Sequence, residues 1–292
     1  MEEAIRQAQQ SNDCPVPNGS LMIIGGAEQK DNRKKKHQFV DHGLEILRQF
    51  VSLITYPTPT IELVTTAGAE DVEGTFEEYK KAFLSLGATE VKHIHHKRRE
   101  DLDHEELESR VNTAHAVFFA GGDQLKLTSI YGGTPFMFFL KTRYIYEQMV
   151  IGGTSAGAMA LSTPMIYSGT GSDEMIAGEI KITTGFEFLR DVCIDTHFVA
   201  RGRFARMAQV IAGNPSNIGI GLEEDTAMVI RNGVDATVVG SGVVIVIDGH
   251  KCFGNDVANF TEHRAVTIRN LEVSVLSNGD KFLIPQLNPP HK

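Results

Sequence analysis

The stretch Met149-Val150-Ile151-Gly152-Gly153-Thr154-Ser155-Ala156-Gly157-Ala158 places the pattern Gly-x-Ser-x-Gly between a short apolar run and a helix-forming segment. In this context the pattern predicts a nucleophile elbow, a tight strand-to-helix turn that exposes a serine hydroxyl at a helix N-terminus. The residues around such a serine must be small because strand and helix approach closely. We therefore expect Ser155 to be a nucleophile. The alternative is a glycine turn that only packs strand against helix.

Apolar runs that end in two glycines recur towards the N-terminus, before Gly25-Gly26 and before Gly121-Gly122. Segments with helical spacing alternate with these runs. Such alternation is typical of an α/β fold with a mostly parallel sheet flanked by helices, in which ligands bind beyond the carboxyl ends of the strands. The expected strands lie at 21–24, 61–66, 91–95, 116–120 and 149–151, and the expected helices at 39–53, 75–86, 105–111, 125–130 and 156–161.

The pattern changes after residue 227. Runs rich in β-branched residues at 228–230, 236–239 and 242–247 are separated by Asn232-Gly233 and Asp248-Gly249, dipeptides that favour hairpins. These runs predict a C-terminal antiparallel extension that finishes the sheet. Because no break in composition divides the chain, we expect a single α/β hydrolase domain over residues 20–292, behind a flexible polar N-terminal arm at 1–19.

Composition excludes several classes of protein. The 292 residues carry 28 Lys+Arg against 37 Asp+Glu, a net charge of −9, which disfavours binding to nucleic acid. The three cysteines form no Cys-x-x-Cys pair, so neither a disulfide framework nor a zinc ribbon is supported. The polar N-terminus does not resemble a secretory signal, and no apolar run approaches the roughly 20 residues of a membrane span. We expect a cytoplasmic protein without metal or cofactor.

A serine nucleophile needs a base, and the best candidate is His197. Three arginines follow it, at Arg201, Arg203 and Arg206. We interpret this local cluster as too basic for a core and suited to binding substrate carboxylates through bidentate hydrogen bonds. The alternative is a helix face on which the arginines pair with some of the 37 acids.

A third group should orient the imidazole of the base. Glu223-Glu224-Asp225 follows an apolar run at 219–222. Adjacent carboxylates repel one another unless a cation or a hydrogen-bond donor lies nearby. We choose Glu224 as the orienting acid, with Glu223 and Asp225 as alternatives that sequence order alone does not separate.

Backbone N–H groups near the serine are candidates for an oxyanion hole. The N–H of Ala156 follows the nucleophile directly, and the turn at Gly121-Gly122 is expected at the same sheet edge, so Gly122 is a second candidate donor. The neighbouring Gln124 is a candidate substrate contact. The alternative is a plain strand-to-helix turn in which Asp123 caps the helix.

The run His93-Ile94-His95-His96 is a candidate metal site, because alternating side chains on a strand share one face. The Lys97-Arg98-Arg99 sequence that follows would repel a cation. We therefore expect a solvated loop here and no bound metal.

Five segments, in this order along the chain, resemble the cyanophycinases within the peptidase E-like serine peptidases. The spacing His-Phe-x-x-Arg-x-Arg-x-x-Arg points to cyanophycinases rather than to the small dipeptidases. The matching segments are Ile23-Ile24-Gly25-Gly26-Ala27-Glu28, Phe119-Ala120-Gly121-Gly122-Asp123-Gln124, Gly152 to Ala158, Asp195 to Arg206, and Gly221-Leu222-Glu223-Glu224-Asp225-Thr226-Ala227.

The resemblance implies a class I glutamine amidotransferase-like fold, a homodimer, and hydrolysis of cyanophycin by an exopeptidase. Cyanophycin is a polyaspartate with arginine on each side-chain carboxylate, and the implied products are β-aspartyl-arginine dipeptides. By position, Ser155 resembles the nucleophile, His197 the base and Glu224 its partner. The residues that resemble the substrate pocket are Gln124, Asp195, Arg201, Arg203 and Arg206.

Thr196 departs from the resemblance, because the family usually has glutamine there. A hydroxyl cannot make the same hydrogen bonds as an amide, so a substrate contact by Thr196 would differ from that of the family. Two other functions remain open. One is a peptidase for short aspartyl peptides, which the three arginines disfavour, and the other is a binding protein without catalysis, which the intact Ser155, His197 and Glu224 disfavour.

Overall fold

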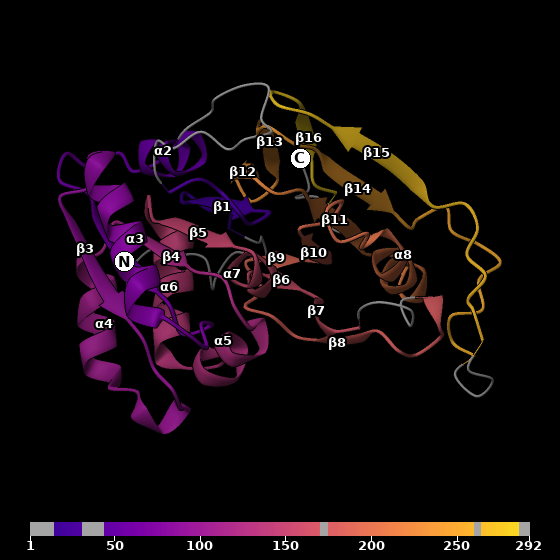
Figure 1. The fold of residues 1–292 in the computed structure, drawn as a ribbon, viewed down its shortest axis with the longest axis horizontal. Coiled ribbons are helices and arrows are strands. Elements are labelled where there is room, and N and C mark those ends of the chain that lie inside the picture. Colours follow the sequence, from indigo (N-terminus) through magenta and orange to yellow (C-terminus); the bar gives the residue numbers. More distant parts are fainter. Residues whose placement is uncertain (1–14, 31–43, 170–174, 260–263, 286–292) are drawn as a thin grey trace.

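The computed structural model describes residues 15–30, 44–169, 175–259 and 264–285. Two mixed β-sheets adjoin in it (Figure 1). The N-terminal half of the chain, drawn in indigo to magenta, forms most of the first sheet and its helices. The second sheet and the helix α8 (Phe204–Gly213) come from the C-terminal half and lie in the centre and right of the figure. This arrangement confirms the expected α/β class and adds a second sheet that the sequence did not predict.

The first sheet has eight strands in the order β16-β13-β12-β1-β5-β4-β2-β3. The five strands from β1 to β3 in that order run parallel, and the other three are antiparallel. Of these three, β12 and β13 belong to the expected extension, and β16 was not among the expected strands. The bounds are β1 (Ser20–Ile24), β2 (Thr60–Val64), β3 (Glu90–Ile94), β4 (Ala116–Phe119), β5 (Val150–Thr154), β12 (Thr226–Arg231), β13 (Asp235–Gly240) and β16 (Lys281–Leu283).

Helices cover both faces of this sheet, and the strand sequences explain why. Successive side chains of a strand point to opposite faces. Leu21 and Ile23 join the buried cluster that includes α4, α5 and α6, whereas Met22 and Ile24 join the one that includes α2 and α3. The helices are α2 (Glu45–Ser52), α3 (Val72–Ser85), α4 (His104–Thr113), α5 (Gln124–Tyr131), α6 (Pro135–Tyr146), α7 (Ala156–Ala160) and α8 (Phe204–Gly213), with a 3-10 turn η1 (Arg99–Asp101).

The second sheet has six strands in the order β15-β14-β11-β10-β6-β9. The run at 242–247 was expected to continue the first sheet, and this is wrong: β14 pairs antiparallel with β11. Alternating apolar residues predict a strand but do not specify its partner. The bounds are β6 (Ser162–Thr163), β9 (Leu189–Arg190), β10 (Val192–Thr196), β11 (Ile218–Leu222), β14 (Val244–Asp248) and β15 (Glu272–Leu276), and a separate ribbon pairs β7 (Met165–Ser168) with β8 (Lys181–Thr183).

Two helices were not among the expected elements. One is α8, and the other is α6, which has clear start signals: Thr134 is its N-cap and Pro135 its first residue. The expected helix at 39–53 appears as α2, and residues 39–43 lie outside the described ranges.

Most of the expected N-terminal arm, residues 1–14, also lies outside the described ranges. At the end of the arm, two backbone hydrogen bonds attach the chain to the last turn of α6. The N–H of Asn18 donates to the Ile145 carbonyl at 3.0 Å, and that of Gly19 to the Tyr144 carbonyl at 2.9 Å. In the described parts of the chain, no helix has both the length and the apolar content to cross a bilayer.

Candidate active site

Ser155 lies in the turn between β5 and α7. Its backbone φ of 51° and ψ of −118° are rarely adopted by residues with a side chain, and a nucleophile elbow imposes this kind of strain. Glycines on either side make the turn possible. A Cβ on Gly153 would lie 2.6 Å from the backbone of Gly157, and one on Gly157 would lie 2.1 Å from the Phe119 carbonyl oxygen. The elbow therefore has the predicted form.

His197 follows β10, and its ring faces the serine. Its Nε2 lies 3.0 Å from Ser155 Oγ. Its backbone N–H donates to the Gly25 carbonyl at 2.9 Å, so the turn after β1 fixes the histidine. Gly26 packs against the ring, because a Cβ there would lie 2.4 Å from His197 Cε1 and 2.5 Å from Nε2. The loops after β1 and β10, which belong to different sheets, thus hold the His197 ring against Ser155.

The three acids after β11 have three different partners. Glu224 Oε1 lies 2.7 Å from His197 Nδ1. Glu223 Oε2 instead accepts the backbone N–H groups of Val199 and Ala200, and Asp225 is buried with its Oδ2 accepting from a serine hydroxyl. Of the three alternatives, Glu224 is therefore the acid that holds the imidazole.

The turn at Gly121-Gly122 lies beside the nucleophile. A Cβ on Gly121 would lie 3.8 Å from Ser155 Oγ, and Gly122 has a φ of 139° and is exposed. Ala156 is the first residue of α7, so its N–H has no acceptor within that helix. The two predicted oxyanion-hole donors are thus at the correct edge of the sheet, and their role stays a prediction.

The next two residues of this turn are engaged in local structure. Asp123 is the N-cap of α5, because its Oδ1 accepts the Leu125 N–H at 2.8 Å. Gln124 Nε2 donates to the Ile166 carbonyl of β7 at 2.7 Å. The capping alternative for Asp123 is correct, and the amide of Gln124 connects the turn to the β7–β8 ribbon.

The expectation that the arginine cluster is too basic for a core is wrong for two of its members. Arg203 and Arg206 are 8% and 3% exposed, and Asp195 is fully buried between them. Asp195 Oδ1 accepts from Arg203 Nη1 at 2.9 Å, and Oδ2 accepts from Arg206 Nε at 2.6 Å. Burial lowers the pKa of Arg203. The Asp195 carboxylate, eight and eleven residues before these arginines, pairs with both guanidinium groups, and their role as substrate contacts stays a prediction.

The remaining predicted substrate contacts differ in accessibility. Arg201 is exposed in the turn after His197, where its backbone N–H donates to the His197 carbonyl at 2.9 Å. Thr196 is fully buried, and its Oγ1 has no hydrogen-bond partner within the described residues. The structure therefore leaves Arg201 as the accessible arginine of this cluster, and it does not place Thr196 on an open surface.

A buried acid behind the elbow was not assigned a role from the sequence. Glu28 is 6% exposed, and its Oε2 accepts from Thr154 Oγ1 at 2.7 Å. Its other oxygen accepts from the Tyr79 hydroxyl. Burial, together with the nearby carboxylate, raises the pKa of Tyr79 well above its usual range. Glu28 thus holds the residue that precedes Ser155. The sequence signals were its place one residue after the Gly25-Gly26 turn and its presence in the first of the five segments that carry the resemblance.

The histidine run is more ordered than the solvated loop that was expected. His93 lies in β3, stacked on Phe76, and its Nε2 is 2.7 Å from Thr65 Oγ1. His96 Nδ1 lies 2.9 Å from the Tyr131 hydroxyl. Each ring has a polar partner at hydrogen-bond distance, which allows it to be half-buried. Within the described ranges, no group of three or more His, Cys, Asp or Glu side chains is placed to hold a metal ion.

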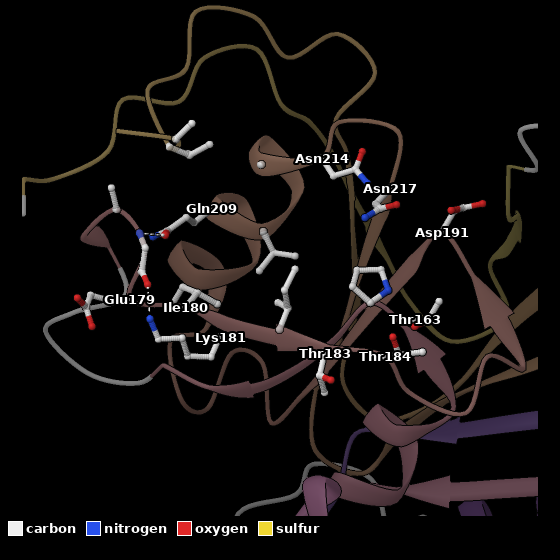
Figure 2. Close-up of a pocket in the computed structure, with 18 residues that line it drawn as sticks. Thr163, Glu179, Ile180, Lys181, Thr183, Thr184, Asp191, Gln209, Asn214 and Asn217 are labelled. Atoms are coloured by element: carbon white, nitrogen blue, oxygen red, sulfur yellow. Dashed lines mark hydrogen bonds between the residues drawn. The ribbon is translucent and has the colours of Figure 1, made fainter. Parts of the chain in front are cut away.

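A cavity of about 1000 Å³ lies away from Ser155, His197 and Glu224, between the β7–β8 ribbon and α8 (Figure 2). Thr183 lines it from β8 and Gln209 from α8, and Asp191 lies at its edge, before β10. His197 follows the other end of β10. None of the predicted site residues lines this cavity, so its size does not identify it as the catalytic site.

Comparison with known proteins agrees with this geometry. The family model "Peptidase family S51" matches residues 21–238. A cyanophycinase from Nostoc sp. is 29% identical over 269 residues, which cover 91% of this chain and 86% of the relative. A cyanophycinase from Thermosynechococcus vestitus is 30% identical over 275 residues, which cover 94% of this chain and 82% of the relative.

Solved structures share the fold. A peptidase from an acI-B1 actinobacterium aligns with a TM-score of 0.65 at 22% identity, covering 92% of this chain and 98% of that one. A putative peptidase E protein from Listeria monocytogenes aligns with a TM-score of 0.53 at 17% identity, covering 77% of this chain and 99% of that one. The family match spans the elbow, the histidine and the acid, and the chain therefore belongs to the serine peptidase family S51.

Proposed function

We propose that this protein is a cyanophycinase that hydrolyses cyanophycin to β-aspartyl-arginine dipeptides. The observation that carries the proposal is the continuous contact from Ser155 Oγ to His197 Nε2, at 3.0 Å, and from His197 Nδ1 to Glu224 Oε1, at 2.7 Å. The cyanophycinases among its relatives support the choice of substrate.

In the first half of the proposed reaction, Ser155 Oγ attacks the carbonyl carbon of the scissile amide while His197 Nε2 takes the hydroxyl proton. Glu224 accepts the Nδ1–H of the resulting imidazolium and stabilises its charge. The carbonyl oxygen becomes an oxyanion beside the N–H groups of Ala156 and Gly122. The C–N bond then breaks, His197 returns the proton to the leaving amine, and an ester remains on Ser155.

In the second half, water takes the place of the amine. His197 removes a proton from water, and the oxygen attacks the ester carbonyl. The ester C–O bond breaks, and the proton passes from His197 to Ser155 Oγ, which restores the hydroxyl. Every proton and electron pair in this cycle is accounted for by substrate, water and the three side chains.

The charges of the protein suit a substrate that carries both signs. Each cyanophycin unit has a free arginyl carboxylate and a guanidinium group. The net charge of −9 favours the approach of a polymer rich in guanidinium groups. Arg201 is exposed in the turn that begins at His197, which makes it the candidate partner for a substrate carboxylate at the site.

A second candidate function is hydrolysis of short aspartyl peptides. The sequence disfavoured it because three arginines exceeded what a small substrate needs. Asp195 holds two of those arginines in a buried cluster, and this weakens that objection. Purified protein should therefore be given cyanophycin and short β- and α-aspartyl peptides, with products identified by mass spectrometry. We expect β-aspartyl-arginine from the polymer. Rapid cleavage of the short peptides with an untouched polymer would instead support the second function.

Adding a methyl group at Gly26 should disable the base without unfolding the protein. In Gly26→Ala the Cβ would overlap the His197 ring, which must move away from Ser155 Oγ, and misplacement by about 1 Å costs on the order of 100-fold in rate. We expect kcat for dipeptide release to fall by about that factor. The matched control is Gly87→Ala, which has a similar φ of +108° against +99° but nothing within 4 Å. If both variants lose the same activity, the ring contact is not the cause.

The homodimer and the cytoplasmic location also stay proposals, supported by the resemblance and by the composition. Sedimentation velocity of the purified protein tests the first. A single species at twice the mass of 32.1 kDa is expected, and a monomer across micromolar concentrations would contradict it.

A further inference from the structure

A second pocket, of about 760 Å³, lies at the carboxyl ends of β2 and β3. Its ionisable lining is mainly basic, whereas the whole chain carries −9. Four permanently cationic side chains line it against two carboxylates, and a third carboxylate, that of Asp101, pairs with one of the cations. The remaining excess of positive charge attracts anions. The cations are Lys97, Arg98, Arg99 and Lys126, and the carboxylates are Glu73 and Glu100.

Two of the four cations are already engaged. Arg98 pairs with Asp101 at 2.9 Å. Arg99 Nη1 donates to carbonyls at the end of α5, with Gly132 the nearest at 2.6 Å. Lys126 has only a long contact of 3.4 Å to the Gly68 carbonyl, and within the described ranges Lys97 has no carboxylate at ion-pair distance. These two lysines are available to a ligand.

His93 and His96 line the same pocket. Burial lowers the pKa of both imidazoles, which favours their neutral form. Thr65 and Tyr131 hold them in place. The positive charge therefore comes from the lysines and arginines. A ligand here would be an anion rather than a metal cation.

The pocket is one loop away from the nucleophile. Gly68 lines the pocket, and the carbonyl of the preceding Ala67 accepts the Asp123 N–H at 2.9 Å. The Gly121-Gly122 turn that leads to Asp123 lies beside Ser155. In the sheet, β3 is three strands from β5, which is roughly 14 Å at about 4.8 Å per strand.

We propose that this pocket binds a carboxylate of cyanophycin, from a unit near the one attached to Ser155, through Lys97 and Lys126. This inference rests on the proposed function and extends it to longer substrates. An extended backbone spans about 3.3–3.6 Å per residue, so about four backbone residues cover the separation. A substrate of two units is too short to use the pocket, whereas a longer one gains affinity from it.

The test compares Lys97→Ala/Lys126→Ala with the wild type on two-unit and eight-unit cyanophycin oligomers. We expect KM for the eight-unit oligomer to rise about five- to tenfold, with kcat unchanged and the two-unit kinetics unaffected, and Lys97→Arg/Lys126→Arg to restore KM. The matched control is Lys81→Ala, an exposed lysine on α3 outside this pocket. An unchanged KM for the longer oligomer, or an equal rise for both oligomers, would overturn the proposal.

A binding measurement separates this inference from the proposed function. Calorimetry with the eight-unit oligomer and Ser155→Ala protein, with and without the two lysine changes, needs no turnover. Weaker binding only when the lysines are replaced supports the pocket. Equal binding refutes it. If the proposed function itself is wrong, the kinetic test will show wild-type protein that releases nothing from either oligomer.

Discussion

Replacing Asp195 with alanine should destabilise the protein by about 3–5 kcal/mol, the usual cost of leaving a buried charge without its partner. The carboxylate is fully buried and accepts from Arg203, Arg206 and the Thr196 N–H. Its removal would leave the guanidinium groups of two arginines, whose side chains are 10% and 4% exposed, without this counter-charge. Because native proteins are stable by only about 5–15 kcal/mol, the effect should be large in urea unfolding followed by circular dichroism.

The matched control for that variant is an exposed ion pair. Glu78 pairs with Lys30 at 3.3 Å, and its side chain is 64% exposed, so Glu78→Ala should unfold close to the wild-type midpoint. Asp195→Asn should fall between the two, because it keeps an acceptor and loses the charge. If Asp195→Ala were no less stable than Glu78→Ala, the buried cluster would not be holding β10 and α8 together.

Local sequence was sufficient to predict the elbow, because the conformation of Ser155 depends on its immediate neighbours. The small residues Gly153 and Gly157 and the flanking strand and helix are all within ten residues. The parallel strands with glycine turns were predictable for the same reason. The placement of these turns at one edge then followed from the parallel order of the strands.

The burial of the arginines could not be predicted from local sequence. Their spacing suggested an open binding site, but whether an arginine is buried depends on a carboxylate that the fold brings to it. Asp195 was visible in the sequence, yet its side chain could be assigned to Arg203 and Arg206 only once β10 and α8 were packed together.

The same limit applies to the acids around the site. Glu28 contacts Thr154 from 126 residues away, a relation that no local pattern contains. The choice among Glu223, Glu224 and Asp225 also depended on how the chain turns after β11, since adjacent side chains there point to different partners. Long-range contacts decide such roles.

Replacing Ser155 with alanine should abolish catalysis while leaving the fold intact. The variant lacks the oxygen that forms the acyl bond, and His197 then has no hydroxyl to activate. Removal of a triad member in serine peptidases costs on the order of 10⁴–10⁶ in kcat. Stability should change little, because among the described residues the Oγ has a single hydrogen-bond partner, His197, and alanine fits a turn that demands small residues.

The measurement that tests the account most directly is the rate of β-aspartyl-arginine release from cyanophycin by wild-type and Ser155→Ala protein at equal concentration. Unfolding midpoints confirm that both are folded. We predict steady release by the wild type, and release by the variant lower by at least about a thousandfold. Release by the folded variant within tenfold of the wild type would contradict the assignment of Ser155 as the nucleophile.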